Sequence, residues 1–191
     1  MRFTLYYAGN VKAEGRDKGH VHEIRHCFHK QLAVLWSREP LSGVRTNFLN
    51  ERDDQGNENS ICLIKKVGAF QFAPLVSSRL DFFAELAFTI LRPGPPGSLF
   101  SEGGDIDNSL KTLFDALKVP DGNQLPSHAQ PTDDETPFFC LLEDDKLIKD
   151  VSVKTDSLLD GSVSGSHAVV LIHVVIWATD VKSYSAIGLG G

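Results

Sequence analysis

The spacing of apolar and polar residues predicts a chain of short strands with two helices. Arg2–Tyr7 and Phe83–Leu91 alternate apolar and polar residues, which is typical of strands with one buried face. From His20 to about Trp36, and again over Asp107–Lys118, apolar residues recur at helical spacing. Short apolar segments predict five further strands, at Ile61–Ile64, Phe70–Val76, Phe138–Leu142, Lys146–Thr155 and Val169–Trp177.

These elements predict a single α+β domain over residues 1–182, with a mixed β-sheet and few helices. Within it, the polar segment 45–60 is interpreted as a loop and the proline-rich segment 118–143 as an irregular insertion. The two strands that flank residues 143–145 are predicted to form a hairpin or meander, and the last predicted strand to be central in the sheet. The glycine-containing segment 183–191 is predicted to be a flexible tail.

Composition excludes several classes of protein. With 191 residues, 41% hydrophobic and 23% charged, the chain is long and apolar enough for one globular domain rather than a disordered chain. It has no apolar run of bilayer length, so we expect no membrane association. The amino-terminal residues do not resemble a secretory signal, and Cys27, Cys62 and Cys140 have no metal-ligand spacing. We therefore expect a cytoplasmic protein.

Charge is unevenly distributed along the chain, whose formal net charge is −6. Residues 1–66 hold 11 Lys/Arg and 8 Asp/Glu, or +3, and residues 67–191 hold 8 and 17, or −9. A polyanion such as DNA would therefore meet the first third of the chain, whereas the remainder is suited to cations. The candidate DNA contacts are Lys12, Arg16, Lys18 and Arg92, for which a solvated loop or a surface salt bridge is an equal alternative.

Two aspartates at the start of the second predicted helix give the clearest chemical signal. Asp105 and Asp107 are two residues apart, so in extended geometry both carboxylates point the same way. Such carboxylates repel each other unless a cation lies between them, and hard oxygen ligands suit Mg²⁺ or Mn²⁺. Lys111, one helical turn beyond Asp107, is placed to stabilise charge on a phosphodiester. Taken singly, the aspartates are also typical helix caps, and the lysine a typical surface residue.

The residues from Asp105 to Leu117, together with the later Asp-Asp pair before a strand, resemble the signature of the RusA-type Holliday junction resolvases. The resemblance implies a RusA-like fold and a homodimeric, Mg²⁺-dependent endodeoxyribonuclease that cuts branched DNA in recombination and repair, with no nucleotide cofactor. It implies Asp105, Asp107 and Asp145 as metal ligands and catalytic residues, Lys111 as the catalytic lysine, and Asn108, Asp115 and Asp144 in supporting roles.

Three features depart from that family: the long segment 118–143, the lack of a basic loop before the motif, and the acidic chain. They leave two alternatives, a binding module for nucleic acid or protein without turnover, and a nuclease for flaps, single strands or RNA.

Four histidines are further candidates for a site. His22, His26 and His29 lie on one side of the first predicted helix, away from its apolar stripe. We interpret that side as solvated, with zinc binding or phosphate contact as alternatives. His173, within an apolar strand, is interpreted as a hydrogen-bonded core residue rather than a ligand.

Overall fold

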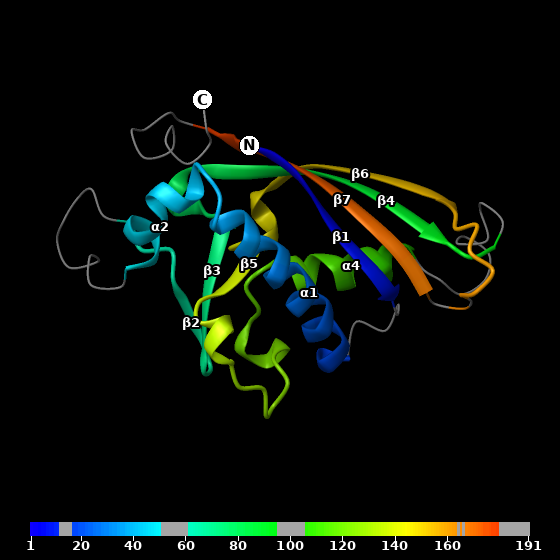
Figure 1. The fold of residues 1–191 in the computed structure, drawn as a ribbon, viewed down its shortest axis with the longest axis horizontal. Coiled ribbons are helices and arrows are strands. Elements are labelled where there is room, and N and C mark those ends of the chain that lie inside the picture. The colour runs from blue at the N-terminus through cyan, green and yellow to red at the C-terminus, as the bar shows by residue number, and fades with distance from the viewer. Residues whose placement is uncertain (12–16, 51–60, 95–105, 164, 166, 180–191) are drawn as a thin grey trace.

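Two β-sheets and three α-helices make up the part of the chain that the structure, a computed structural model, describes (Figure 1). The described residues are 1–191 without 12–16, 51–60, 95–105, 164, 166 and 180–191. The predicted α+β domain is therefore confirmed, but its strands are divided between two mixed sheets rather than one. The predicted tail at 183–191 lies outside the described residues.

The larger sheet has four strands in the order β1-β7-β4-β6. Its central strand β7 is antiparallel to both neighbours, whereas the edge strand β6 is parallel to β4. The central position predicted for the last strand is confirmed. The bounds are Arg2–Asn10 for β1, Phe82–Arg92 for β4, Ile148–Ser157 for β6 and His167–Ala178 for β7.

The smaller sheet has three strands in the order β2-β3-β5, at Lys65–Val67, Phe70–Val76 and Phe138–Leu142. Strand β3 is antiparallel to β2 and parallel to β5. The hairpin predicted around residues 143–145 is wrong, because β5 pairs with β3 and β6 with β4. Every residue of β5 is buried, so this strand needs cover on both faces, which a solvent-facing hairpin would not provide. Residues 61–64 are not a strand.

Three helices pack against these sheets: α1 (Lys18–Trp36), α2 (Leu41–Leu49) and α4 (Ile106–Leu117). The side chain of Asp17 caps α1 by accepting a hydrogen bond from the His20 amide at 3.1 Å. Helix α2 replaces the start of the loop predicted at 45–60, because Val44 and Phe48, four residues apart, are both buried on one face. Most of the rest of that loop lies outside the described residues.

The segment 118–143 is irregular only over its first part. Two short 3₁₀ turns, at Gly122–Gln124 and Asp133–Glu135, lead into β5, whose residues belong to the core. The predicted insertion thus ends before residue 138. A hydrogen bond from the Val119 amide to the Leu142 carbonyl, at 2.9 Å, joins its start to the end of β5.

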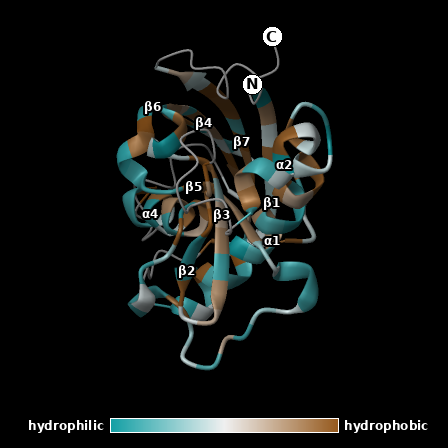
Figure 2. Cartoon of the chain, turned by 90° about the vertical axis from the view of Figure 1, so that its left-hand side faces the viewer, coloured by the Kyte–Doolittle hydropathy of each residue, from teal (hydrophilic) through white to brown (hydrophobic). Residues whose placement is uncertain are grey.

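One face of the four-stranded sheet is buried and the other is open. Along β4, buried residues alternate with half-exposed ones, and the buried Phe88 packs against Phe114 of α4. Figure 2 shows hydrophobic residues concentrated on the strands inside the molecule and hydrophilic residues on the outer loops. The open face carries Tyr6, Leu171 and Trp177, which are all exposed.

The two edges of this sheet differ in what pairs with their backbone. At the β1 edge, the Gln31 side chain of α1 pairs with the backbone of Tyr6: its Oε1 accepts from the Tyr6 amide at 2.8 Å and its Nε2 donates to the Tyr6 carbonyl at 2.7 Å. A side-chain amide thus takes the place of a neighbouring strand. At the other edge, β6 pairs with β4 alone among the described strands.

Candidate functional site

The motif helix α4 presents two of the predicted catalytic residues to solvent. Asp107 lies in its first turn and Lys111 one turn later, and both are exposed on the same side of the helix. Asp105 lies outside the described residues. The carbonyl of Asn108 accepts a hydrogen bond from the Thr112 hydroxyl at 3.1 Å. The structure therefore keeps Asp107 and Lys111 together.

Arg92 fixes the beginning of this helix against the end of β4. Its Nη2 donates to the Ser109 hydroxyl at 2.9 Å and to the Val11 carbonyl at 3.4 Å, and the side chain is half-buried. These bonds give Arg92 a structural role at the start of α4, and its phosphate contact stays a prediction. Of the other candidate DNA contacts, Lys18 is exposed at the start of α1, whereas Lys12 and Arg16 lie outside the described residues.

Asp145 lies at the opposite end of α4 from Asp107. Its Oδ2 accepts a hydrogen bond at 3.0 Å from Nζ of Lys118, which directly follows the last helical residue. Residues 107 and 118 are 11 positions apart, or about 16 Å along a helix axis. The prediction that Asp145 joins Asp107 within one chain is therefore wrong. The reason is topological: α4 runs back from the end of β4, and β6 is parallel to β4, so the residues before β6 meet the end of α4.

Lys118 neutralises the negative charge of two carboxylates, Asp115 and Asp145, at this end of α4. Its Nζ also lies 3.4 Å from Oδ1 of Asp115. Burial lowers the pKa of Lys118, but the hydrogen bond to Asp145 and the charge of Asp115 outweigh it, so the pKa is raised overall. The hydrogen bond from Lys118 in turn lowers the pKa of Asp145. A lysine thus occupies the position where the predicted site would place a cation between carboxylates.

The remaining supporting residues stabilise local structure. The Asp115 carbonyl accepts a hydrogen bond at 2.7 Å from Nη2 of the buried Arg25, which links α1 to α4. The Asp144 side chain accepts from the Lys146 amide at 2.9 Å and caps the 3₁₀ turn Asp145–Leu147. Among the described residues, no group of three or more His, Cys, Asp or Glu side chains is placed to hold a metal ion. A three-carboxylate magnesium site therefore does not fit the described residues of a single chain.

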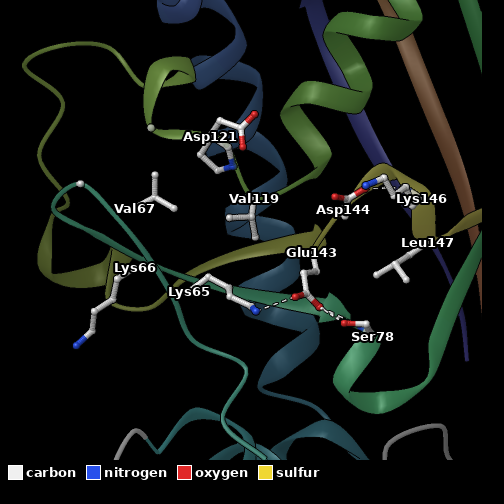
Figure 3. A pocket seen from close by; sticks show the side chains of 13 residues that line it. Lys65, Lys66, Val67, Ser78, Val119, Asp121, Glu143, Asp144, Lys146 and Leu147 are labelled. Carbon is white, nitrogen blue, oxygen red and sulfur yellow. Dashed lines mark hydrogen bonds and ion pairs between the residues drawn. The ribbon is translucent and has the colours of Figure 1, made fainter.

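A cavity of about 780 Å³ opens near the carboxyl ends of β3 and β5, where sequence reasoning identified no site (Figure 3). Glu143 lies at its wall and accepts hydrogen bonds from the Ser77 hydroxyl at 2.6 Å and from the amide and hydroxyl of Ser78 at 3.0 and 3.1 Å. Lys65 of β2 forms an ion pair with it at 2.7 Å. In the sequence, this cavity is indicated by the polar residues that directly follow two apolar segments, those that form β3 and β5.

These partners predict a pH-dependent contribution of Glu143 to stability. Although burial raises its pKa, the hydrogen bonds from Lys65, Ser77 and Ser78 prevail and lower the pKa from 4.5 to about 2. Because the folded-state pKa lies below the unfolded one, the stabilisation is complete above about pH 4.5 and is lost as the pH falls toward 2. After allowance for solvent screening, we expect Glu143→Gln to lower the free energy of unfolding by about 1–2 kcal/mol at pH 7.

Urea unfolding at pH 7 and at pH 3 measures this contribution. The difference between wild type and Glu143→Gln should shrink at the lower pH, whereas the exposed control Glu23→Gln should show little difference at either pH. A difference that does not change with pH would contradict the assignment.

His22 and His29 of α1 are buried and His26 is half-buried, so the solvated face predicted for these histidines is wrong. His22 is 7% and His29 3% exposed, and both rings pack against Phe138 of β5. The imidazoles satisfy their polar atoms locally: Nδ1 of His29 accepts from the Phe139 amide at 2.8 Å. His26 forms an ion pair with Glu135. An aromatic strand beneath the helix thus accommodates rings that periodicity alone assigned to solvent.

His173 is exposed, although the sequence predicts a buried core residue. It lies on the open face of β7, exposed, with Nδ1 3.4 Å from the Thr4 hydroxyl of β1. The strand is apolar on both sides, but in the structure one of its faces is buried and the other is exposed or half-exposed.

Comparison with models of known protein families, with curated proteins and with solved structures finds no match to this chain. Within the described residues, no helix combines the length and apolar composition that crossing a bilayer requires.

Proposed function

We propose that this protein is a Mg²⁺-dependent endodeoxyribonuclease of RusA-like type that cuts branched DNA, with Mn²⁺ as a possible substitute ion. The observation that carries the proposal is the pairing of Asp107 and Lys111 on the exposed side of α4, immediately after Asp105 in the sequence. Asp107 would hold the metal ion beside a phosphodiester, and Lys111 lies one helical turn away from it. Lys111 would neutralise the charge that develops on that phosphodiester during cleavage.

The order of elements supports the same proposal. A strand, β4, leads into the motif helix α4, and the Asp-Asp pair directly precedes a further strand, β6, of the same sheet. The arrangement matches the sequence order on which the resemblance rests. Among the described residues of one chain, Asp145 is held by Lys118 at the other end of α4, and Asp105 lies outside the described residues, so Asp107 is the one predicted carboxylate that the structure places beside Lys111.

One observation favours a second candidate, a nucleic-acid- or protein-binding module without turnover. Lys118 already neutralises Asp145, so the crowded charges at that end of α4 need no metal ion. In that case the protein would bind DNA without cutting it.

Cleavage assays separate the two candidates. Labelled four-way, flap and linear DNA are incubated with the protein in Mg²⁺ or Mn²⁺, beside Asp107→Asn and Lys111→Ala. We expect branched DNA to be cut and each substitution to reduce the rate by about 100-fold or more. Glu23→Gln and Lys30→Ala, at exposed positions on α1, serve as matched controls and should retain activity. DNA binding without cleavage in either metal would instead support the binding module.

A further inference from the structure

The open face of the four-stranded sheet carries aromatic side chains that the candidate site on α4 does not use. We propose that the half of this face formed by β1 and β7, the β1–β7 surface, binds single-stranded DNA. Unpaired bases would stack on Tyr6 and Trp177, and Arg2 would hold a phosphate. The assignment to DNA rests on the nuclease function proposed above, whereas the stacking surface itself does not.

The first argument is the exposure of the rings on the β1–β7 surface. Tyr6 is 48% and Trp177 44% exposed, and Leu171, directly across from Tyr6, is 37% exposed. Helices α1 and α4 pack on the other face of the sheet (Figure 1). Large apolar side chains that gather on one open face of a globular domain mark an interaction surface. An open four-stranded sheet with exposed rings is one arrangement that holds unpaired bases.

The second argument is the spacing of the rings, which follows from the register of the sheet. Tyr6 lies across from Leu171, and Trp177 is six residues further along β7, or about 20 Å. Successive bases of a stacked strand are about 3.4 Å apart, so the two rings span about six nucleotides. The core of a protein interface is a continuous apolar patch, whereas Thr4 and His173 place polar groups between these rings. The spacing therefore favours a row of bases over a protein partner.

The third argument is charge. Strands β1 and β7 contain no Asp or Glu, and Arg2 is exposed on the outward side of β1, across from Val175. Arg2 thus lies at a level between Tyr6 and Trp177, where it meets the phosphates of a strand whose bases stack on both rings. The carboxylates of the open face belong to the other two strands, β4 and β6: Glu85, Asp150 and Asp156. They confine an anionic strand to the β1–β7 surface.

The fourth argument is the position of this surface relative to α4. Tyr6 lies on the level of Thr89 of β4, with β7 between them. Arg92, three residues or about 10 Å further along β4, is hydrogen-bonded to the first turns of α4. An unpaired arm would leave the β1–β7 surface around this end of the sheet, next to the helix that presents Asp107 and Lys111.

The two tryptophans of the chain allow the stacking to be measured directly. Trp177 is exposed and Trp36 is fully buried, so a base that stacks on the sheet quenches the emission of Trp177 alone. A twelve-nucleotide oligothymidylate at low salt should quench the fluorescence of the wild type and leave that of Trp177→Leu unchanged. A blunt duplex of the same length, whose bases are already stacked, should quench less. No quenching of the wild type at oligonucleotide concentrations up to about 0.1 mM would overturn the proposal.

Fluorescence anisotropy of the labelled oligothymidylate tests each contact. Tyr6→Ala and Trp177→Ala should each weaken binding by at least about fivefold in Kd, whereas Tyr6→Phe and Trp177→Phe, which keep a ring, should stay within about twofold of wild type. Arg2→Ala should weaken binding and lower its salt dependence by about one phosphate contact. Val34→Ala, which changes a 50% exposed apolar residue on α1, is the matched control and should have no effect. Equal affinities of the alanine and phenylalanine variants would overturn the stacking contacts.

Three further outcomes separate this surface from its alternatives. Tighter binding of an oligouridylate of the same length would overturn the assignment to DNA. Sedimentation that shows self-association through these rings, lost in the Tyr6→Ala Trp177→Ala double variant, with no oligonucleotide bound, would assign the face to a protein contact and overturn the proposal. A wild type that binds the oligothymidylate but cuts no DNA would reject the nuclease and retain the stacking surface. A wild type that cuts branched DNA without quenching of Trp177 would do the reverse.

Discussion

Phe138→Ala is expected to lower the free energy of unfolding by about 3–5 kcal/mol, the largest effect of any substitution considered for this chain. The side chain is fully buried in β5, and its ring lies 5.2 Å from Phe72 and 4.4 Å from His29 between ring centroids. It thus contacts both α1 and a neighbouring strand of the smaller sheet. Alanine would leave a cavity lined by aromatic rings, which a rigid helix and sheet cannot close.

Urea or thermal unfolding followed by circular dichroism measures this loss. Leu159→Ala is the matched control, because Leu159 is also a large apolar residue but is 96% exposed, and it should change stability by less than about 0.5 kcal/mol. Should the variant fail to fold, Phe138→Leu provides a milder cavity and should still destabilise. A loss below about 1 kcal/mol for Phe138→Ala would show that the histidine face of α1 does not depend on β5.

Acidification from pH 7.5 to pH 4.5 is expected to destabilise the protein by about 2 kcal/mol through His22. Burial, followed by the charges of His26 and Arg25, lowers its pKa from 6.5 to about 4, although Glu135 acts in the opposite direction. Because the folded-state pKa lies below the unfolded one, the unfolded chain binds the proton first. The penalty therefore begins below about pH 6.5 and grows until about pH 4. His29, whose pKa burial also lowers, adds in the same sense.

His22→Asn tests this assignment. Nδ1 of His22 lies 3.2 Å from Nη1 of Arg25, and an asparagine oxygen retains an acceptor there without a titrating ring. The variant should therefore lose less stability than wild type between pH 7.5 and pH 4.5, when both are measured by urea unfolding. His173→Asn, at an exposed position, should follow the wild-type curve. An unchanged pH dependence in His22→Asn would contradict the role of the buried ring.

The elements with regular spacing were predictable from the sequence, whereas their pairing was not. The stripe of α1 and the alternation of β4 each reflect one buried face, and both elements lie close to their predicted bounds. Nothing in the local pattern indicates that β5 pairs with β3, which lies more than 60 residues earlier in the chain. The pattern also cannot show that an aromatic strand lies beneath the polar side of α1, and so the histidines were assigned to solvent.

Some positions of the candidate site could likewise be predicted from the sequence, and others could not. Asp107 and Lys111 share a helix, so their proximity follows from helical spacing alone. The place of Asp145 depends on the direction in which α4 returns along β4, and on Lys118, whose position relative to Asp145 no local rule specifies. The hydrogen bond that holds Arg92 could not be predicted from local spacing, because its partner Ser109 lies 17 residues further along the chain.

Gln31 limits how the four-stranded sheet could extend by the addition of further chains. A sheet with two available edges can add copies without end and form a filament. Here the glutamine amide already uses both backbone groups of Tyr6, whereas β6 pairs on one side only among the described strands. Association through β6 would therefore stop at two molecules, and one hydrogen-bonded side chain on α1 would distinguish a finite complex from a fibre.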